Sequence, residues 1–315
     1  MEEEFDFETI SKILNQVSTT YSDSQQFIAA IYEDDKVEIR FSDLSGIDTS
    51  LFNTGTYTTA SNQDITIEVS YVTGPEIVPF IGDIKEHPPL QVVDSVVLGG
   101  DPVRNTVAID YYGTISFFTT QMDISVKTTS GTKKCSTANA LVSNNHVIAR
   151  SDKGKKGEKI WVPTNPQIAA LHCFIPLKSD PDVDVATAGT YDMSTVETWK
   201  LRDIGKLADI KLPKKGTAIR KYGARTGLTS GKVLGMANIQ IKGIMYNGVF
   251  VTSGGFGCPG DSGSTVVNSA NDLLGIYSWG ENIDCSKKPK GYFYSFITPK
   301  SFRPEGEEVE IKVAR

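Results

Sequence analysis

Short β-branched and aromatic runs, separated by glycine, aspartate and asparagine, make up most of the chain from residue 96 onward. Thr114–Thr119, Asn139–Ser143 and Leu273–Trp279 are examples. Such runs are typical of strands, and no helical pattern is repeated between them. Strands that follow one another without crossover helices pair mainly as antiparallel neighbours. The sequence therefore predicts a mainly β fold, as an antiparallel barrel or sandwich.

The residues before this region follow a different pattern. Residues 6–18 place apolar side chains at helical spacing, which predicts one amphipathic helix. Strand-like runs follow at 27–32, 36–41 and 64–72, and together these elements indicate a small α+β module. Residues 75–95 carry four prolines and no clear period, which is typical of a linker or an extended crossing.

Charge and composition exclude several classes of function. The 315 residues include 32 basic and 38 acidic side chains, so the net charge of −6 argues against nucleic acid as a partner. No stretch approaches 18 consecutive apolar residues, so we expect no membrane-spanning helix and no membrane partner. Metal-ligand spacings such as Cys-x-x-Cys and a glycine-rich phosphate loop are both missing from the sequence, so we expect no metal and no other cofactor.

The segment Gly257–Ser264 carries the strongest chemical signal, Gly-Cys-Pro-Gly-Asp-Ser-Gly-Ser. A serine between glycines can sit on a tight turn with backbone N–H groups converging on one point. Such a cradle stabilises an oxyanion by about 3–4 kcal/mol per donor. A serine hydroxyl is a poor nucleophile without a hydrogen-bonded base, so the motif requires a histidine.

Three histidines are available, and one is well placed. His87 lies in the proline-rich segment and His172 in an apolar run, whereas His146 directly follows an apolar strand. The base also needs a carboxylate that fixes its tautomer. Asp184 opens a short apolar strand and is the favoured acid, with Asp182 as the alternative.

The order His146, Asp184, Ser262, with Ser-Asn-Asn-His-Val around the histidine, resembles the chymotrypsin-fold (trypsin-like) serine proteases. Residues 226–231 also resemble a stretch of the Nal1-like bacterial and plant kind. The resemblance implies two antiparallel six-stranded β-barrels over residues 96–300. It leaves an α+β module and linker at 1–95 and a C-terminal extension at 301–315.

The resemblance also implies a role for each matching residue. Ser262 attacks the scissile carbonyl of a protein or peptide substrate, His146 takes the proton, and Asp184 holds His146. The N–H groups of Gly260 and Ser262 form the oxyanion hole. The substrate would lie against four further residues: Phe256, Ser278, Trp279 and Gly280.

The cysteines give a mixed expectation. The resemblance implies a disulfide between Cys258 and Cys285, while Cys135 and Cys173 have no match in the family and are expected to be free. Residues 1–6 lack the features of a secretory signal, which predicts a cytoplasmic location, or a secreted protein if a leader has been removed. A reducing cytoplasm would leave Cys258 and Cys285 unpaired, so that alternative stays open.

Two departures from the family pattern bear on specificity and activation. Phe256 stands where trypsin-type members carry an acid at the pocket floor, which predicts a shallow pocket for small or modest apolar residues rather than arginine or lysine. Val97 to Gly100 could supply a new N-terminus that pairs with Asp261 after cleavage; a plain strand followed by a Gly-Gly turn is the favoured interpretation. Residues 1–95 could bind a regulatory partner or simply pack.

Three functions compete at this point. The first is an active serine endopeptidase that works through an acyl-enzyme. The second is a catalytically inactive protease-fold protein that acts as a binding or regulatory scaffold, an alternative kept open by Phe256. The third, an α/β-hydrolase esterase, fails because that fold runs serine, acid, histidine and needs Gly-x-Ser-x-Gly.

Overall fold

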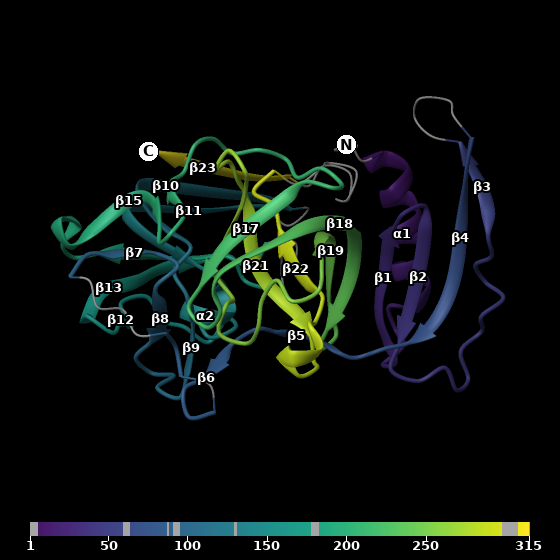
Figure 1. The fold of residues 1–315 in the computed structure, drawn as a ribbon, viewed down its shortest axis with the longest axis horizontal. Helices are drawn as coiled ribbons and strands as arrows, with labels where there is room; N and C mark the ends of the chain where they lie inside the picture. Colours follow the sequence, from purple (N-terminus) through teal and green to yellow (C-terminus); the bar gives the residue numbers. More distant parts are fainter. Residues whose placement is uncertain are drawn as a thin grey trace.

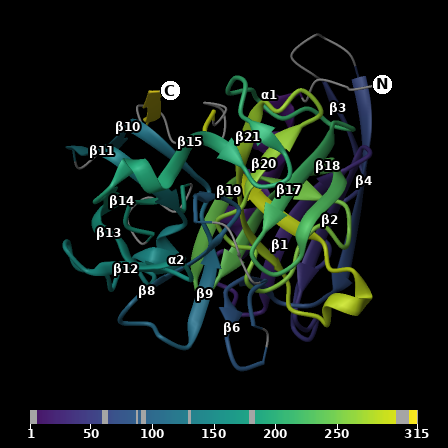
Figure 2. The same cartoon turned by 60° about the vertical axis from the view of Figure 1, so that its left-hand side comes forward.

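Three bodies of the chain lie side by side in the computed structural model, as Figures 1 and 2 show. They are a first β-barrel, a second β-barrel and an N-terminal module that contains the long helix α1 (Phe7–Tyr21). The structure describes residues 6–58, 64–86, 88–90, 95–128, 131–177, 183–297 and 308–314. Among these residues β-strands dominate.

The second barrel is a closed ring of six antiparallel strands. Its order is β17-β20-β21-β22-β19-β18, and β17 pairs with β18 to close the ring. The bounds are β17 (Ala218–Gly223), β18 (Gly227–Ile241), β19 (Ile244–Thr252), β20 (Thr265–Asn268), β21 (Leu273–Glu281) and β22 (Gly291–Tyr294). All nine residues of β21 are buried, so this strand runs through the middle of the structure.

The first barrel is built from a nine-stranded sheet. Its order is β23-β10-β11-β14-β13-β12-β8-β9-β6. The bounds are β6 (Gly82–Asp83), β8 (Pro102–Asn105), β9 (Tyr111–Thr114), β10 (Phe117–Thr128), β11 (Gly131–Ser143), β12 (Lys159–Val162), β13 (Asn165–Phe174), β14 (Ala186–Thr190) and β23 (Glu308–Ala314). The end of the chain thus returns as an edge strand beside β10.

Several short elements complete the fold. A small sheet contains β7 (Val97–Gly99), β15 (Val196–Leu201) and β16 (Gly205–Lys206), with β7 and β15 parallel. The short helix α2 (Asn145–Ile148) follows β11, and the 3₁₀ turns η1 (Met193–Thr195) and η2 (Cys285–Lys287) complete the set.

The N-terminal module continues the sheet of the second barrel. Its strands are β1 (Phe27–Glu33), β2 (Lys36–Phe41), β3 (Gly55–Thr58) and β4 (Asp64–Thr73), and β1 pairs antiparallel with β18. The β1–β2 hairpin turns at Asp34 and Asp35, both with positive φ, as a two-residue loop requires. Helix α1 begins after Asp6, whose carboxylate accepts from the Thr9 N–H (3.1 Å). It packs Ile10, Leu14 and similar side chains onto the module's core.

The proline-rich segment is an ordered crossing between the barrels. It contains β5 (Ile77–Pro79), which pairs with β21, and β6, which pairs with β9. Figure 1 shows the segment leaving β4, passing the foot of the second barrel at β5, and reaching β6 beside the first barrel. Of the two interpretations of this segment, a linker or an extended crossing, the described residues show the crossing, because their backbone is bonded to both barrels.

The first barrel contains a disulfide that the sequence did not suggest. Cys135 on β11 and Cys173 on β13 are bonded, with their Cα atoms 6.0 Å apart. Strand β14 lies between these two strands, and both sulfur atoms flank its residue Thr187. The expectation that these cysteines are free is wrong, because the sheet brings together residues 38 positions apart.

Candidate active site

The predicted acid and base are joined in the first barrel. The imidazole Nδ1 of His146 is hydrogen-bonded to Oδ2 of Asp184, and the His146 backbone N–H donates to Oδ1 of the same carboxylate (3.1 Å). Both side chains are buried. Asn144 donates from its amide to the Asp184 carbonyl (2.7 Å), which ties the two segments together. The alternative acid, Asp182, and the histidine of the proline-rich segment, His87, lie outside the described residues.

The predicted nucleophile sits on a tight turn where the barrels meet. The Ser262 carbonyl accepts from the Thr114 N–H (2.7 Å), and the Gly260 carbonyl accepts from the Thr114 hydroxyl (2.9 Å). Gly263 follows with φ +100°, and a Cβ there would lie 2.0 Å from the Thr114 carbonyl oxygen. Only glycine fits this position, so the Gly-Asp-Ser-Gly motif sets how closely strand β9 approaches the serine.

The Ser262 hydroxyl is directed at strand β21. Its Oγ donates to the carbonyl of Ser278 (2.7 Å). Across the site, Nε2 of His146 is buried and has no hydrogen-bond partner within the described parts of the chain. An unsatisfied buried nitrogen is costly, so this nitrogen is open to a hydrogen-bond donor.

The N–H groups of the serine turn converge on one oxygen. Gly260 N (2.6 Å) and Ser262 N (3.3 Å) both donate to the carbonyl of Phe80, in the crossing segment. Two backbone donors aimed at one carbonyl oxygen are the arrangement that stabilises an oxyanion. Sequence reasoning did not single out Phe80, because proline-rich surroundings concealed the short strand that positions it.

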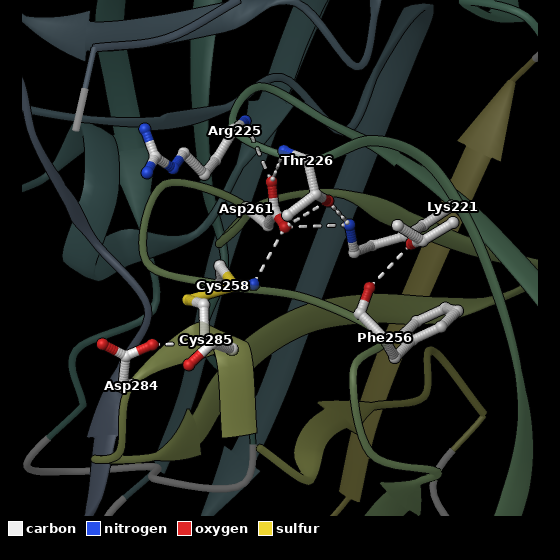
Figure 3. Close-up of a disulfide and its surroundings, with 10 residues drawn as sticks. Lys221, Arg225, Thr226, Phe256, Cys258, Asp261, Asp284 and Cys285 are labelled. Carbon is white, nitrogen blue, oxygen red and sulfur yellow. Dashed lines mark hydrogen bonds and ion pairs between the residues drawn. A yellow bond between two sulfur atoms is a disulfide. The ribbon is translucent and has the colours of Figure 1, made fainter. Parts of the chain in front are cut away.

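A buried ion pair anchors the same turn (Figure 3). Asp261, between the two donors, accepts from Lys221 Nζ (3.0 Å) and from the Thr226 hydroxyl (2.7 Å). The backbone N–H groups of Cys258, Arg225 and Thr226 also donate to it, at 3.0–3.1 Å. Lys221 and Asp261 are both 0% exposed. Burial lowers the pKa of Lys221, and the Asp261 charge opposes that shift.

This ion pair bears on the activation alternative. Asp261 is paired with a side chain from β17, while Val97 is buried in strand β7 beside β15. The segment from Val97 to Gly100 is therefore a strand followed by a turn, as the favoured interpretation had it. In this structure Asp261 has its cationic partner without a new N-terminus.

Cys258 and Cys285 form a disulfide beside the turn, with Cα atoms 5.9 Å apart (Figure 3). It ties the loop before the serine to η2, just after strand β21. The predicted wall residues Ser278, Trp279 and Gly280 all lie in β21 and are buried. Phe256 is fully buried too, edge-on to Tyr277 with ring centroids 5.6 Å apart. Its ring belongs to a buried hydrophobic cluster.

Comparison with known proteins identifies the family. The model of the trypsin family matches residues 118–300, more than half of the chain. The chain belongs to the trypsin family. This match confirms the predicted fold class, mainly β with the two-barrel fold of chymotrypsin-like serine proteases. Comparison with the curated proteins gave no match.

Solved structures of bacterial proteases are similar in fold to this trypsin-family chain. Cellulomonas bogoriensis chymotrypsin is 17% identical, with 63% of this chain and 91% of that one covered and a TM-score of 0.45. The Nocardiopsis protease NAPase is 14% identical (63% and 92%, TM-score 0.44). Thermobifida fusca protease A is 17% identical (68% and 98%, TM-score 0.44).

The described residues contain neither a metal-binding cluster nor a membrane-spanning helix. No group of three or more histidine, cysteine, aspartate or glutamate side chains there is arranged to hold a metal ion. No helix in the same parts of the chain is long and apolar enough to cross a membrane.

Proposed function

We propose that this trypsin-family protein is a serine endopeptidase that hydrolyses peptide bonds through an acyl-enzyme. One observation carries the proposal: the carboxylate-bound His146 keeps an Nε2 with no partner among the described residues, and the N–H groups of Gly260 and Ser262 converge on one carbonyl oxygen. A base, an acid that orients it and an oxyanion cradle are the parts that acyl transfer needs.

The steps follow from these parts. Ser262 Oγ leaves the Ser278 carbonyl, turns toward His146 and attacks the substrate carbonyl carbon, while Nε2 takes its proton. Asp184 keeps Nδ1 protonated and stabilises the imidazolium. The Gly260 and Ser262 N–H groups bind the oxyanion, and His146 then protonates the leaving amine. Water, activated by the same imidazole, releases the acyl group.

The direction of the Ser262 hydroxyl supports a second candidate. A hydroxyl held on Ser278, 2.7 Å away, is what an inactive protease-fold scaffold would show. Labelling of the nucleophile separates the two candidates, because a fluorophosphonate reacts only with a serine that has a working base.

The test is intact-mass analysis after incubation with a fluorophosphonate. We expect one adduct on the wild-type chain and on Ser264→Ala, which removes the neighbouring hydroxyl of the same motif, and none on Ser262→Ala. The variant Phe80→Asp is labelled in parallel, because Phe80 covers the oxyanion cradle in the structure. Absence of adduct from both the wild type and Phe80→Asp would favour the scaffold.

A further inference from the structure

Residues 76–83 are here called the strap, and their first part, residues 76–80, lies along β21 as an added antiparallel strand. Ile77, Val78 and Pro79 stand opposite Glu281, Gly280 and Trp279. Two further hydrogen bonds extend the ladder, from Asn282 N to the Glu76 carbonyl (2.7 Å) and from Phe80 N to the Ser278 carbonyl (3.1 Å). The strap thus occupies the strand edge that the sequence resemblance assigned to a substrate backbone, and its bonds are those of β-strand addition.

Phe80 occupies the position expected for the substrate residue whose carbonyl carbon Ser262 would attack. Its carbonyl oxygen receives both N–H groups of the cradle, and its side chain is 1% exposed. The ring lies 5.9 Å from that of Tyr277. A Cβ on Gly280 would lie 1.9 Å from the tip of the Phe80 ring, so the lack of a side chain at 280 is what admits an aromatic group.

The chain is also held beyond Phe80. Gly82 pairs with Tyr112 and Asp83 with Tyr111 on strand β9 of the first barrel. The Ile84 N–H donates to the Asp110 carbonyl (2.9 Å). The peptide bond between Phe80 and Ile81 is therefore fixed on both sides, by the second barrel before it and by the first barrel after it. Holding both ends of a bond against a nucleophile removes most of the entropic cost of reaction.

We propose that the strap is the protein's own substrate and that Phe80–Ile81 is a self-cleavage site. This inference rests on the proposed function. Ser262 Oγ bonds to the Phe80 carbonyl carbon and its proton passes to His146. The bond from that carbon to the Ile81 nitrogen breaks, and His146 returns the proton to the departing amine. Water then splits the Phe80–Ser262 ester, leaving a carboxylate at Phe80, an ammonium at Ile81 and the original hydroxyl.

Two consequences follow for specificity and for the uncut chain. The residue in the pocket is aromatic, so the enzyme accepts phenylalanine or a similar large apolar residue before the cleaved bond, a larger group than the sequence suggested. Until the cut is made, the strap excludes other substrates from β21. After the cut, the β1–β18 ladder still holds the N-terminal fragment on the second barrel.

The experiment follows the full-length wild type and Ser262→Ala over time by intact mass and N-terminal sequencing. We expect the wild type to become two chains, the second beginning Ile81-Gly82-Asp83, and Ser262→Ala to stay whole. The rate constant should not change over about a hundredfold dilution, because the substrate is part of the same molecule. The two fragments should elute together on size exclusion.

Two variants keep the outcomes distinct. Phe80→Asp and the milder Phe80→Ala, both checked for folding by circular dichroism, should lose cleavage at this bond. At the first time points, before self-cleavage, the wild type should hydrolyse a phenylalanine peptide at least about tenfold more slowly than Phe80→Asp, because a tethered competitor acts at millimolar effective concentration.

An intact wild type beside a fluorophosphonate-labelled Phe80→Asp would overturn the inference and leave the proposed function standing. Absence of both cleavage and labelling in every variant would overturn both. Cleavage at another bond, or equal cleavage of Ser262→Ala, would overturn the inference alone.

Discussion

Two fully buried aspartates, one in each barrel, stand beside the proposed base and nucleophile with different partners. Asp184 in the first barrel binds the two nitrogens of His146, its ring Nδ1 and its backbone N–H. Asp261 in the second barrel binds the Lys221 ammonium, the Thr226 hydroxyl and three backbone N–H groups.

The difference separates a chemical role from an architectural one. The Asp184 carboxylate has one partner, His146, which takes the serine's proton in the proposed mechanism, so its charge matters most in that step. Asp261 is bonded to the Lys221 ammonium and to four further donors, so its compensation does not depend on that proton transfer. We therefore expect changes at Asp184 to alter rate with little effect on stability, and changes around Asp261 to alter both.

Asp184→Asn should give the largest difference between an effect on rate and an effect on stability. The amide keeps the shape of the side chain but favours the wrong imidazole tautomer, so kcat/KM should fall by about 10⁴-fold. The thermal midpoint should stay close to that of the wild type. Peptide hydrolysis and calorimetry on the same sample measure the two effects. A large drop in midpoint with intact activity would reverse the roles assigned to the two aspartates.

Breaking the second pair should have a mixed effect. Lys221→Met leaves Asp261 as an uncompensated buried charge, which costs about 3–5 kcal/mol of unfolding free energy. The loosened turn misplaces the Gly260 N–H, so kcat should fall by about 10²–10³-fold. Denaturant unfolding and single-turnover kinetics report these separately.

The control is the double variant Lys221→Met, Asp261→Asn. It removes both charges, so it should regain much of the lost unfolding free energy. If the double variant is no more stable than Lys221→Met, the ion pair is not what makes Lys221 necessary.

Removing one disulfide or the other should give the smallest difference in activity between two variants. Cys135→Ala with Cys173→Ala and Cys258→Ala with Cys285→Ala should each cost about 3.5 kcal/mol on the chain-entropy account. Only the second change should lower kcat, by up to about tenfold, because the Cys258 N–H donates to Asp261 (3.0 Å). Equal activity in both variants would show that the turn does not depend on its bridge. Melting curves and initial rates decide it.

Local pattern was enough to predict many elements from the sequence. The helix expected over 6–18 is α1, and the runs at 27–32, 36–41 and 64–72 are β1, β2 and β4 with small changes at their ends. Periodicity and turn residues determine such elements directly. The residues His146, Asp184 and Ser262 were selected because each chemical role admits few residue types.

Long-range pairing could not be predicted in the same way. Nothing local in β1 states that it pairs with β18, about 200 residues later, because register depends on which apolar faces meet in the folded chain. The same limit applies to the Cys135–Cys173 bond. Strand β5 was missed for the same reason. Pro79 interrupts the strand pattern in the sequence, but proline is tolerated on an edge strand.

The pairing of Asp261 with Lys221 bears on which additions before helix α1 the protein can tolerate. Lys221 lies in strand β17, so the cation that pairs with Asp261 in the serine turn is part of the second barrel. We therefore expect that a tag or a fused protein ahead of helix α1 leaves this ion pair unchanged, whatever its length and composition.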